Sequence, residues 1–123
     1  MNTNTARIIG QVLENYWGTQ SSSDGTFSLT YDLSGDQLTL KYKAVVHFAS
    51  ERSLQPQISE ANRRAVTMVN EKLKELKSAY KSTAEESLKT EDLGGGDDIE
   101  LLQPNGPRKV AYYRYNHKFK IQD

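Results

Sequence analysis

The sequence predicts one α+β domain over residues 1–123, with a four-stranded, largely antiparallel sheet that carries helices on one face. Apolar residues recur every three or four positions in two segments, as they do along one side of a helix. In two other regions they alternate with polar residues, which is typical of strands with one buried face. The predicted order is an N-terminal helix, a β-hairpin, a long amphipathic helix and a second β-hairpin.

The first predicted helix lies close to the N-terminus and ends before Gly18, because glycine commonly follows the last turn of a helix. The stretch TQSSSDG, residues 19–25, is rich in small polar residues and is predicted to be a flexible connection. The apolar residues of the helix form one broad face made of Ile8, Ile9, Val12, Leu13, Tyr16 and Trp17.

The first hairpin is predicted from two runs of strict alternation that flank the short break Ser34-Gly35-Asp36. A break of this length between two alternating runs favours a tight turn between antiparallel strands. The apolar set, which we expect to face the helices, is Phe27, Leu29, Tyr31, Leu33, Leu38, Leu40, Tyr42, Ala44, Val46 and Phe48.

The second helix is predicted to run from about Gln57 to Leu88, with Pro56 in its first turn, where proline is tolerated. Its apolar residues form a narrow stripe from Ile58 to Tyr80. Such a helix would be about 48 Å long at 1.5 Å per residue. A four-stranded sheet is narrower than this, so we expect the helix either to break near Ser82-Thr83 or to project and meet a partner.

The second hairpin is predicted downstream of an acidic, glycine-rich stretch. EDLGGGDD, residues 91–98, is predicted to be a mobile loop, because glycine is depleted in strands. Residues 99–102 alternate as a short strand, and PNGP, residues 104–107, reads as a rigid turn. The last strand is RKVAYYRYNHKFKI, residues 108–121.

Splitting the last strand by its two-residue period separates most of its aromatic residues from its cations. Tyr113, Tyr115 and Phe119 belong to the side that should face the helices. If both hairpins share one sheet, the opposite face collects cations from each hairpin, while acids concentrate in residues 85–100. The candidate site residues on that face are Lys41, Lys43, Arg108, Tyr112, Arg114, Lys118 and Lys120.

Three interpretations of this basic face remain open. Exposed strand positions tolerate Lys and Arg, which also discourage aggregation between sheet edges, so the face can simply be solvated. It can dock on an acidic protein surface, such as residues 85–100 of another copy. It can also bind single-stranded RNA or DNA, with Tyr112 stacking on a base. The phosphates would then be contacted by Arg114, Lys118 and Lys120.

Composition argues against several other classes of protein. The net charge is zero, so no overall field selects polyanions or membranes. The absence of Cys excludes disulfides and thiolate metal sites and fits a protein made in the cytosol. No apolar stretch has the length of a signal peptide or of a bilayer span, so we expect a soluble protein, intracellular when made, without a membrane partner.

No recognisable spacing pairs a nucleophile with a base, so we expect a protein that is not an enzyme and has no catalytic residues. His47 and His117, the only histidines, are predicted to point to opposite faces, which argues against a shared metal site. His117, on the helix-facing side, should be a hydrogen-bonded core residue. The GGGDD stretch matches neither a phosphate-binding loop nor a calcium loop, and no cofactor or metal is expected.

Three segments together resemble small proteins of tailed phages related to the T-even-like cyanophages. They are LKYKAVVHFASERSLQ (40–55), DDIELLQPN (97–105) and PRKVAYYRYNHKFKI (107–121), which cover about a third of the chain. This resemblance implies a phage-encoded protein located in the virion or the host cytoplasm, and it carries over no functional residue. We therefore expect a structural or interaction subunit of a larger assembly that associates with other subunits or with itself. The alternative is a regulatory protein that binds single-stranded nucleic acid.

Overall fold

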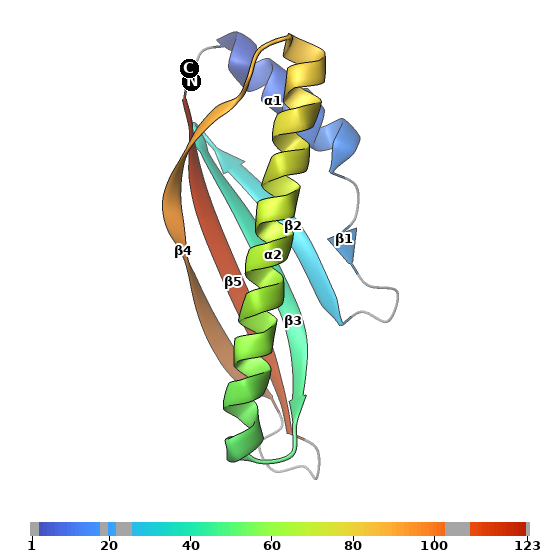
Figure 1. Ribbon diagram of the computed structural model, residues 1–123, viewed down its shortest axis with the longest axis vertical. Coiled ribbons are helices and arrows are strands. Elements are labelled where there is room, and N and C mark those ends of the chain that lie inside the picture. The colour runs from blue at the N-terminus through green and yellow to red at the C-terminus, as the bar shows by residue number, and fades with distance from the viewer. Residues whose placement is uncertain (1–2, 18–19, 22–25, 103–108, 123) are drawn as a thin grey trace.

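The computed structural model describes residues 3–17, 20–21, 26–102 and 109–122, and it confirms the α+β class. The sheet has the order β1-β2-β3-β5-β4 with antiparallel neighbours throughout, and the two described helices cover one of its faces (Figure 1). The elements are α1 (Thr3–Tyr16), β1 (Gln20–Ser21), β2 (Phe27–Ser34), β3 (Gln37–Phe48), α2 (Glu51–Ala84), β4 (Lys89–Leu102) and β5 (Lys109–Gln122).

The sheet has one more strand than predicted, because Gln20 and Ser21 pair with β2 as the two-residue strand β1. The prediction of a flexible connection was therefore wrong for these two residues. The predicted helix stop at Gly18 and the predicted turn at residues 104–107 lie outside the described residues.

The hairpin of β2 and β3 forms as predicted, with Ser34 opposite Gln37 across a two-residue turn. Gly35 occupies the first turn position with φ = 60°, a left-handed conformation that glycine adopts without steric cost. The carbonyl oxygen of Asp36 accepts a hydrogen bond from the Ile121 backbone N–H (2.7 Å). This bond attaches the turn to the end of β5.

The long helix α2 begins six residues before the predicted start at Gln57, so Pro56 lies inside it rather than in its first turn. Ser50 is extended and caps the helix, and its backbone N–H donates to Ser53 Oγ (3.1 Å). A capping box at Ser50 thus starts the helix earlier than predicted. Pro56 has no backbone N–H, so the helix lacks one backbone hydrogen bond at that position.

The helix has 34 residues and does not break near Ser82-Thr83, and its C-terminal end lies beside α1 (Figure 1). At 1.5 Å per residue its length is about 51 Å. Figure 1 shows that α2 runs along the strands rather than across them. The length of the helix should therefore be compared with the length of the strands and not with the width of the sheet. Ala84, the last helical residue, still packs against the core, and Glu85 ends the helix in a left-handed conformation with φ = 60°.

The core lies between the two helices and the face of the sheet that they cover, called here the inner face. Tyr113, Phe119 and Ile9 are among the largest fully buried side chains, and they come from β5 and α1. The indole N–H of Trp17 donates to the Leu29 carbonyl oxygen (3.3 Å), which links the end of α1 to β2. The alternation of β3 and β5 between buried and exposed residues agrees with the predicted split of both strands.

The prediction for residues 91–98 was wrong, because strand β4 continues through all three glycines and pairs with β5 over its whole length. A register shift between Asp92 and Gly94 accommodates Leu93, and Gly94 has φ = 91°. The Gly94 N–H donates to Asp92 Oδ1 (2.7 Å). Cross-strand pairing with β5 therefore stabilises a segment whose composition favours a loop.

Candidate interaction surface

Six of the seven candidate residues lie together on the face of the sheet that points away from the helices, called here the outer face. Lys43 is directly opposite Arg114, and Lys41 is opposite Asn116, so β3 and β5 place their cations side by side. Arg108 lies outside the described residues. The six that the structure brings together are Lys41, Lys43, Tyr112, Arg114, Lys118 and Lys120.

The acidic segment is not remote from these cations, contrary to the sequence-based expectation. Strand β4 lies next to β5 and places Glu91 opposite Lys120 and Asp98 opposite Arg114. The Arg114 guanidinium contacts the Glu100 carboxylate and lies 3.8 Å from Asp98 Oδ2. Two carboxylates of the same chain therefore share one guanidinium, and part of the predicted basic face is neutralised internally.

Tyr112 is the one candidate aromatic residue, and a lysine already covers one face of its ring. The Lys43 ammonium lies 4.1 Å from the ring centroid, within the range of a cation–π interaction. A base could stack on this face of the ring only after displacing Lys43. The geometry thus weighs against the predicted stacking role of Tyr112.

A polar network on the inner face connects α2 to the edge strand. The Tyr113 hydroxyl donates to Asp97 Oδ2 (2.9 Å) and accepts from the Asn62 side-chain amide (2.8 Å). The Asn62 amide also lies 3.3 Å from Asp97 Oδ2. Burial raises the pKa of the Tyr113 hydroxyl, and the nearby Asp97 carboxylate adds to this rise. No local sequence pattern indicates this network, because three segments that are distant along the chain contribute to it.

A second network holds the glycine-rich part of β4 against β5. The Tyr115 hydroxyl lies 2.7 Å from His117 Nδ1, and His117 Nε2 lies 2.6 Å from Asp92 Oδ1. The hydrogen bond to His117, helped by the Gly94 N–H, lowers the pKa of the Asp92 carboxyl. Burial and the Asp92 charge raise the pKa of Tyr115. His117 is therefore hydrogen-bonded on the inner face as predicted, but it is only partly buried and does not belong to the core cluster.

The two histidines face opposite sides of the sheet, which also confirms the prediction. His47 is opposite Val110 on the outer face, whereas His117 belongs to the inner-face network. Among the described residues, no group of three or more His, Cys, Asp or Glu side chains is placed to hold a metal ion.

Strand β4 carries all the large apolar side chains that are exposed among the described residues. Leu93, Ile99 and Leu101 are exposed by 47%, 40% and 54%. Leu101 also borders a hollow of about 390 Å³ at the start of α2, which is lined by Phe48, Glu51, Leu54, Leu101, Leu102 and Lys109. The sequence analysis identified Ile99 and Leu101 as strand residues but did not predict that they would remain uncovered.

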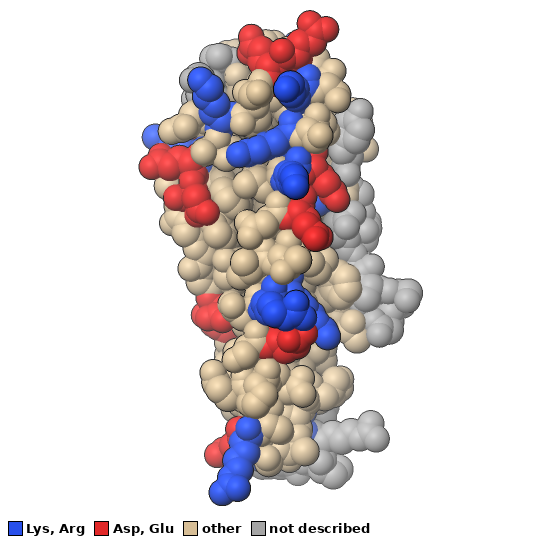
Figure 2. Space-filling view, viewed as in Figure 1, with Lys and Arg blue, Asp and Glu red and all other residues tan. Residues whose placement is uncertain are grey.

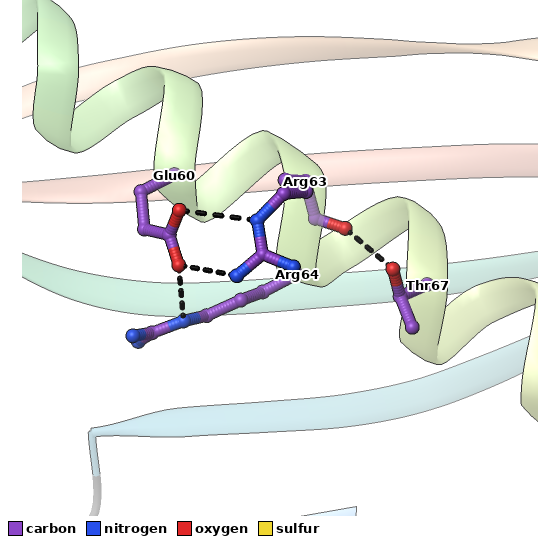
Figure 3. A network of polar contacts seen from close by, with 4 residues as sticks. All are labelled: Glu60, Arg63, Arg64 and Thr67. Atoms are coloured by element: carbon purple, nitrogen blue, oxygen red, sulfur yellow. Dashed lines mark hydrogen bonds and ion pairs between the residues drawn. The ribbon is translucent and has the colours of Figure 1, made fainter.

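The surface of α2 presents charges of both signs rather than one patch, and charged side chains mix along it in Figure 2. Glu60 contacts two arginines, with Arg63 Nη2 at 2.5 Å and Arg64 Nε at 3.2 Å (Figure 3). The hydrogen bond from Arg63 is the main reason that the pKa of Glu60 is lowered. These arginines border a second hollow of about 390 Å³ over Phe27 and Tyr42, and Glu60 already balances one of the two charges.

Within the described residues, neither helix has both the length and the apolar character needed to cross a bilayer. Comparison of the whole chain with known proteins found no matching family model, no matching curated protein and no matching solved structure.

Proposed function

We propose that the chain is a non-enzymatic interaction subunit of a larger protein assembly. The observation that carries this proposal is the concentration of exposed apolar residues on one edge strand. Ile99 and Leu101 lie two positions apart on β4, and Leu101 borders a mainly apolar hollow. The third exposed apolar residue of the strand, Leu93, lies before the glycines and apart from this pair. Exposed apolar surface that is grouped and bordered by polar residues is typical of protein–protein contact sites, whereas scattered single residues are not.

The charges beside this strand give the contact a polar border. Asp98 and Glu100 are exposed next to Ile99 and Leu101, and Arg114 lies behind them on β5. Protein interfaces commonly combine an apolar centre with a charged rim that selects the partner and sets its orientation. The outer face then acts as the rim of the contact, while the apolar end of β4 supplies most of the binding energy.

The resemblance of three segments to small proteins of tailed phages supports a more specific form of the proposal, in which the assembly is a phage particle. Mass spectrometry of purified particles, together with light scattering of the purified protein over a concentration series, tests this form. We expect the chain at a stoichiometric level in particles, or a defined oligomer in solution. A protein that stays monomeric at all concentrations and is absent from particles would contradict the proposal.

Binding of single-stranded nucleic acid is a second candidate function, favoured by one observation. Lys41, Lys43, Lys118 and Lys120 lie on the same outer face as Arg114, and all four lysines are exposed. The acids of β4 and the Lys43 contact with Tyr112 weigh against it.

Fluorescence anisotropy with labelled single-stranded RNA and DNA across a salt series tests this candidate. Phosphate contacts make affinity fall steeply with salt, and removing a cation by Arg114→Gln or Lys118→Gln should flatten the slope. Lys74→Gln is a matched control, because Lys74 is an exposed lysine on α2, which covers the opposite face of the sheet. Absence of binding at low salt would exclude the candidate.

A further inference from the structure

We infer that the outer edge of β4, over residues 97–102, binds an extended segment of a partner protein in which apolar and basic residues alternate. The segment would add to the sheet as a further strand beside β4. This inference rests on the proposed function, since it specifies the partner of the same apolar edge. It commits to a protein partner and to one mode of binding, strand addition.

The position of β4 in the sheet is the first step. It is the last strand in the order β1-β2-β3-β5-β4, and β5 pairs with one side of it only. The backbone groups of an edge strand that point away from the sheet can pair with another strand. Residues 97–102 contain no glycine and lie beyond the register shift between Asp92 and Gly94, so this half of β4 keeps regular pairing with β5.

The inner side of this edge is apolar at Ile99 and Leu101, and it begins at Asp97, whose carboxylate is bonded to Tyr113 and Asn62. Ile99 lies opposite Tyr113 and Leu101 opposite Ala111, and both of these β5 residues are fully buried. Ile99 and Leu101 therefore continue the core toward the edge, but nothing among the described residues covers them fully. Alternate apolar side chains of an added strand would cover Ile99 and Leu101 and reach the hollow beside Leu54.

The outer side of the same edge is acidic. Asp98 lies opposite Arg114 and Glu100 opposite Tyr112, so both carboxylates are on the outer face. They share the single Arg114 guanidinium, which leaves one negative charge in excess. The other alternate side chains of an added strand would lie beside these carboxylates. Lysine or arginine at those positions provides the complementary charge.

Charge also argues against pairing of β4 with β4 of a second copy. The strand contains five acidic residues and one lysine. Two such strands side by side would bring like charges together, which is unfavourable for directly opposed residues. The strand of this chain with alternating basic and apolar residues is β5, which is already paired on both sides. The occupant is therefore expected to come from a different protein.

Fluorescence anisotropy with labelled peptides tests the inference on the full-length protein. The probe is a ten-residue peptide in which isoleucine and lysine alternate, with a terminal diglycine for solubility. One control peptide replaces lysine with glutamate, and another has the same composition with all lysines in one block. We expect the alternating basic peptide to bind at least about tenfold more tightly than either control.

Variants of the protein locate the site. Ile99→Ser with Leu101→Ser, and separately Asp98→Asn with Glu100→Gln, should each weaken binding of the alternating peptide about tenfold. Leu93→Ser is the matched control, because Leu93 is also an exposed leucine of β4 but lies before the glycines. Trp17 is the only tryptophan and is buried, so its fluorescence shows whether each variant is folded.

Two results would overturn the inference. The first is equal binding of all three peptides. The second is binding of the alternating peptide that the Ile99/Leu101 and Asp98/Glu100 variants leave unchanged while they remain folded. Oligomer formation or incorporation into particles that persists in these variants would show that the proposed function holds through another surface. A wild-type protein that binds the alternating peptide but neither associates nor enters particles would instead contradict the proposed function alone.

Discussion

Gly95 and Tyr115 face each other so closely that no other residue fits at position 95 without movement. A Cβ atom on Gly95 would lie 2.2 Å from the Tyr115 hydroxyl oxygen and 2.9 Å from His117 Nδ1. The ring of Tyr115 is buried, and its hydroxyl is hydrogen-bonded to His117, so it cannot move aside easily. The glycine-rich composition of β4 thus has a local steric reason, although the sequence analysis interpreted it as a sign of a loop.

Gly95→Ala should therefore destabilise the fold by about 1–3 kcal/mol, the usual cost of forcing an extra carbon into a close contact. Gly96→Ala is the matched control, because a Cβ there meets nothing within 4 Å. Urea unfolding followed by Trp17 fluorescence gives the free energy of unfolding of both variants. Equal stability of the two variants would contradict the assigned contact.

Tyr113→Phe removes the hydroxyl that joins Asn62 of α2 to Asp97 of β4. The residue is fully buried, so loss of its hydrogen bonds should lower the free energy of unfolding by about 1–3 kcal/mol. Tyr112→Phe, one position away on the outer face, should change it by less than about 0.5 kcal/mol. A double-mutant cycle that combines Tyr113→Phe with Asn62→Ala measures the coupling free energy between these two side chains. Purely additive changes in the free energy of unfolding would argue against the network.

Asp92 should give the stability of the protein a defined dependence on pH. Its pKa is lowered from the model-compound value of 3.8 by the hydrogen bonds to His117 and Gly94. A carboxyl with a lowered pKa stabilises the fold above its unfolded-state pKa and loses this contribution as pH falls through the folded-state pKa. The stability difference between the wild type and Asp92→Asn should thus be present in full at pH 7, begin to fall near pH 4, where the carboxyl of the unfolded chain becomes protonated, and be lost as the pH passes below the lowered folded-state pKa. Urea unfolding at several pH values measures it, and a difference that does not shrink as the pH falls below about 4 would contradict the assignment.

Lys72 should stabilise the contact between the two helices through its whole side chain. Its ammonium lies 3.3 Å from the Trp17 carbonyl oxygen and 4.8 Å from the Trp17 ring centroid, and the residue is buried. Lys72→Ala should lower the free energy of unfolding by about 1–3 kcal/mol, and Lys72→Met by less, since methionine retains part of the packing.

Lys74→Ala serves as the control for these variants, because Lys74 is exposed on the same helix. Thermal unfolding followed by circular dichroism compares the three substitutions. If Lys72→Met lowered stability as much as Lys72→Ala, this would show that packing of the aliphatic part of Lys72 does not stabilise the fold.

The regular elements could be predicted because their patterns are local. The strict alternation of β3 and β5 predicted which of their residues are buried, and it placed Lys43 and Arg114 on the same face. Only the end of β4, residues 99–102, could be predicted in this way. The three glycines of β4 interrupt the alternation, and its strand conformation is stabilised by pairing with β5 rather than by its own composition.

The residues that meet on the candidate surface depend on the order of the strands in the sheet, which the sequence pattern does not indicate. Asp98 and Glu100 lie beside Arg114 because β4 follows β5 at the edge of the sheet. Without this strand order, the acids and the cations were interpreted as separate surfaces. The early start of α2 was missed for a different reason, because Pro56 was taken to mark the first turn.

Amide hydrogen exchange of β4 tests the central claim most directly, namely that residues 97–102 form an edge that a partner strand completes. The measurement compares the protein alone with the protein saturated by the alternating isoleucine–lysine peptide. Slower exchange of amides within residues 97–102, with unchanged exchange in β2, is the expected result, because an added strand provides hydrogen-bond acceptors for the outward N–H groups. Saturating peptide that leaves exchange in residues 97–102 unchanged would contradict the claim.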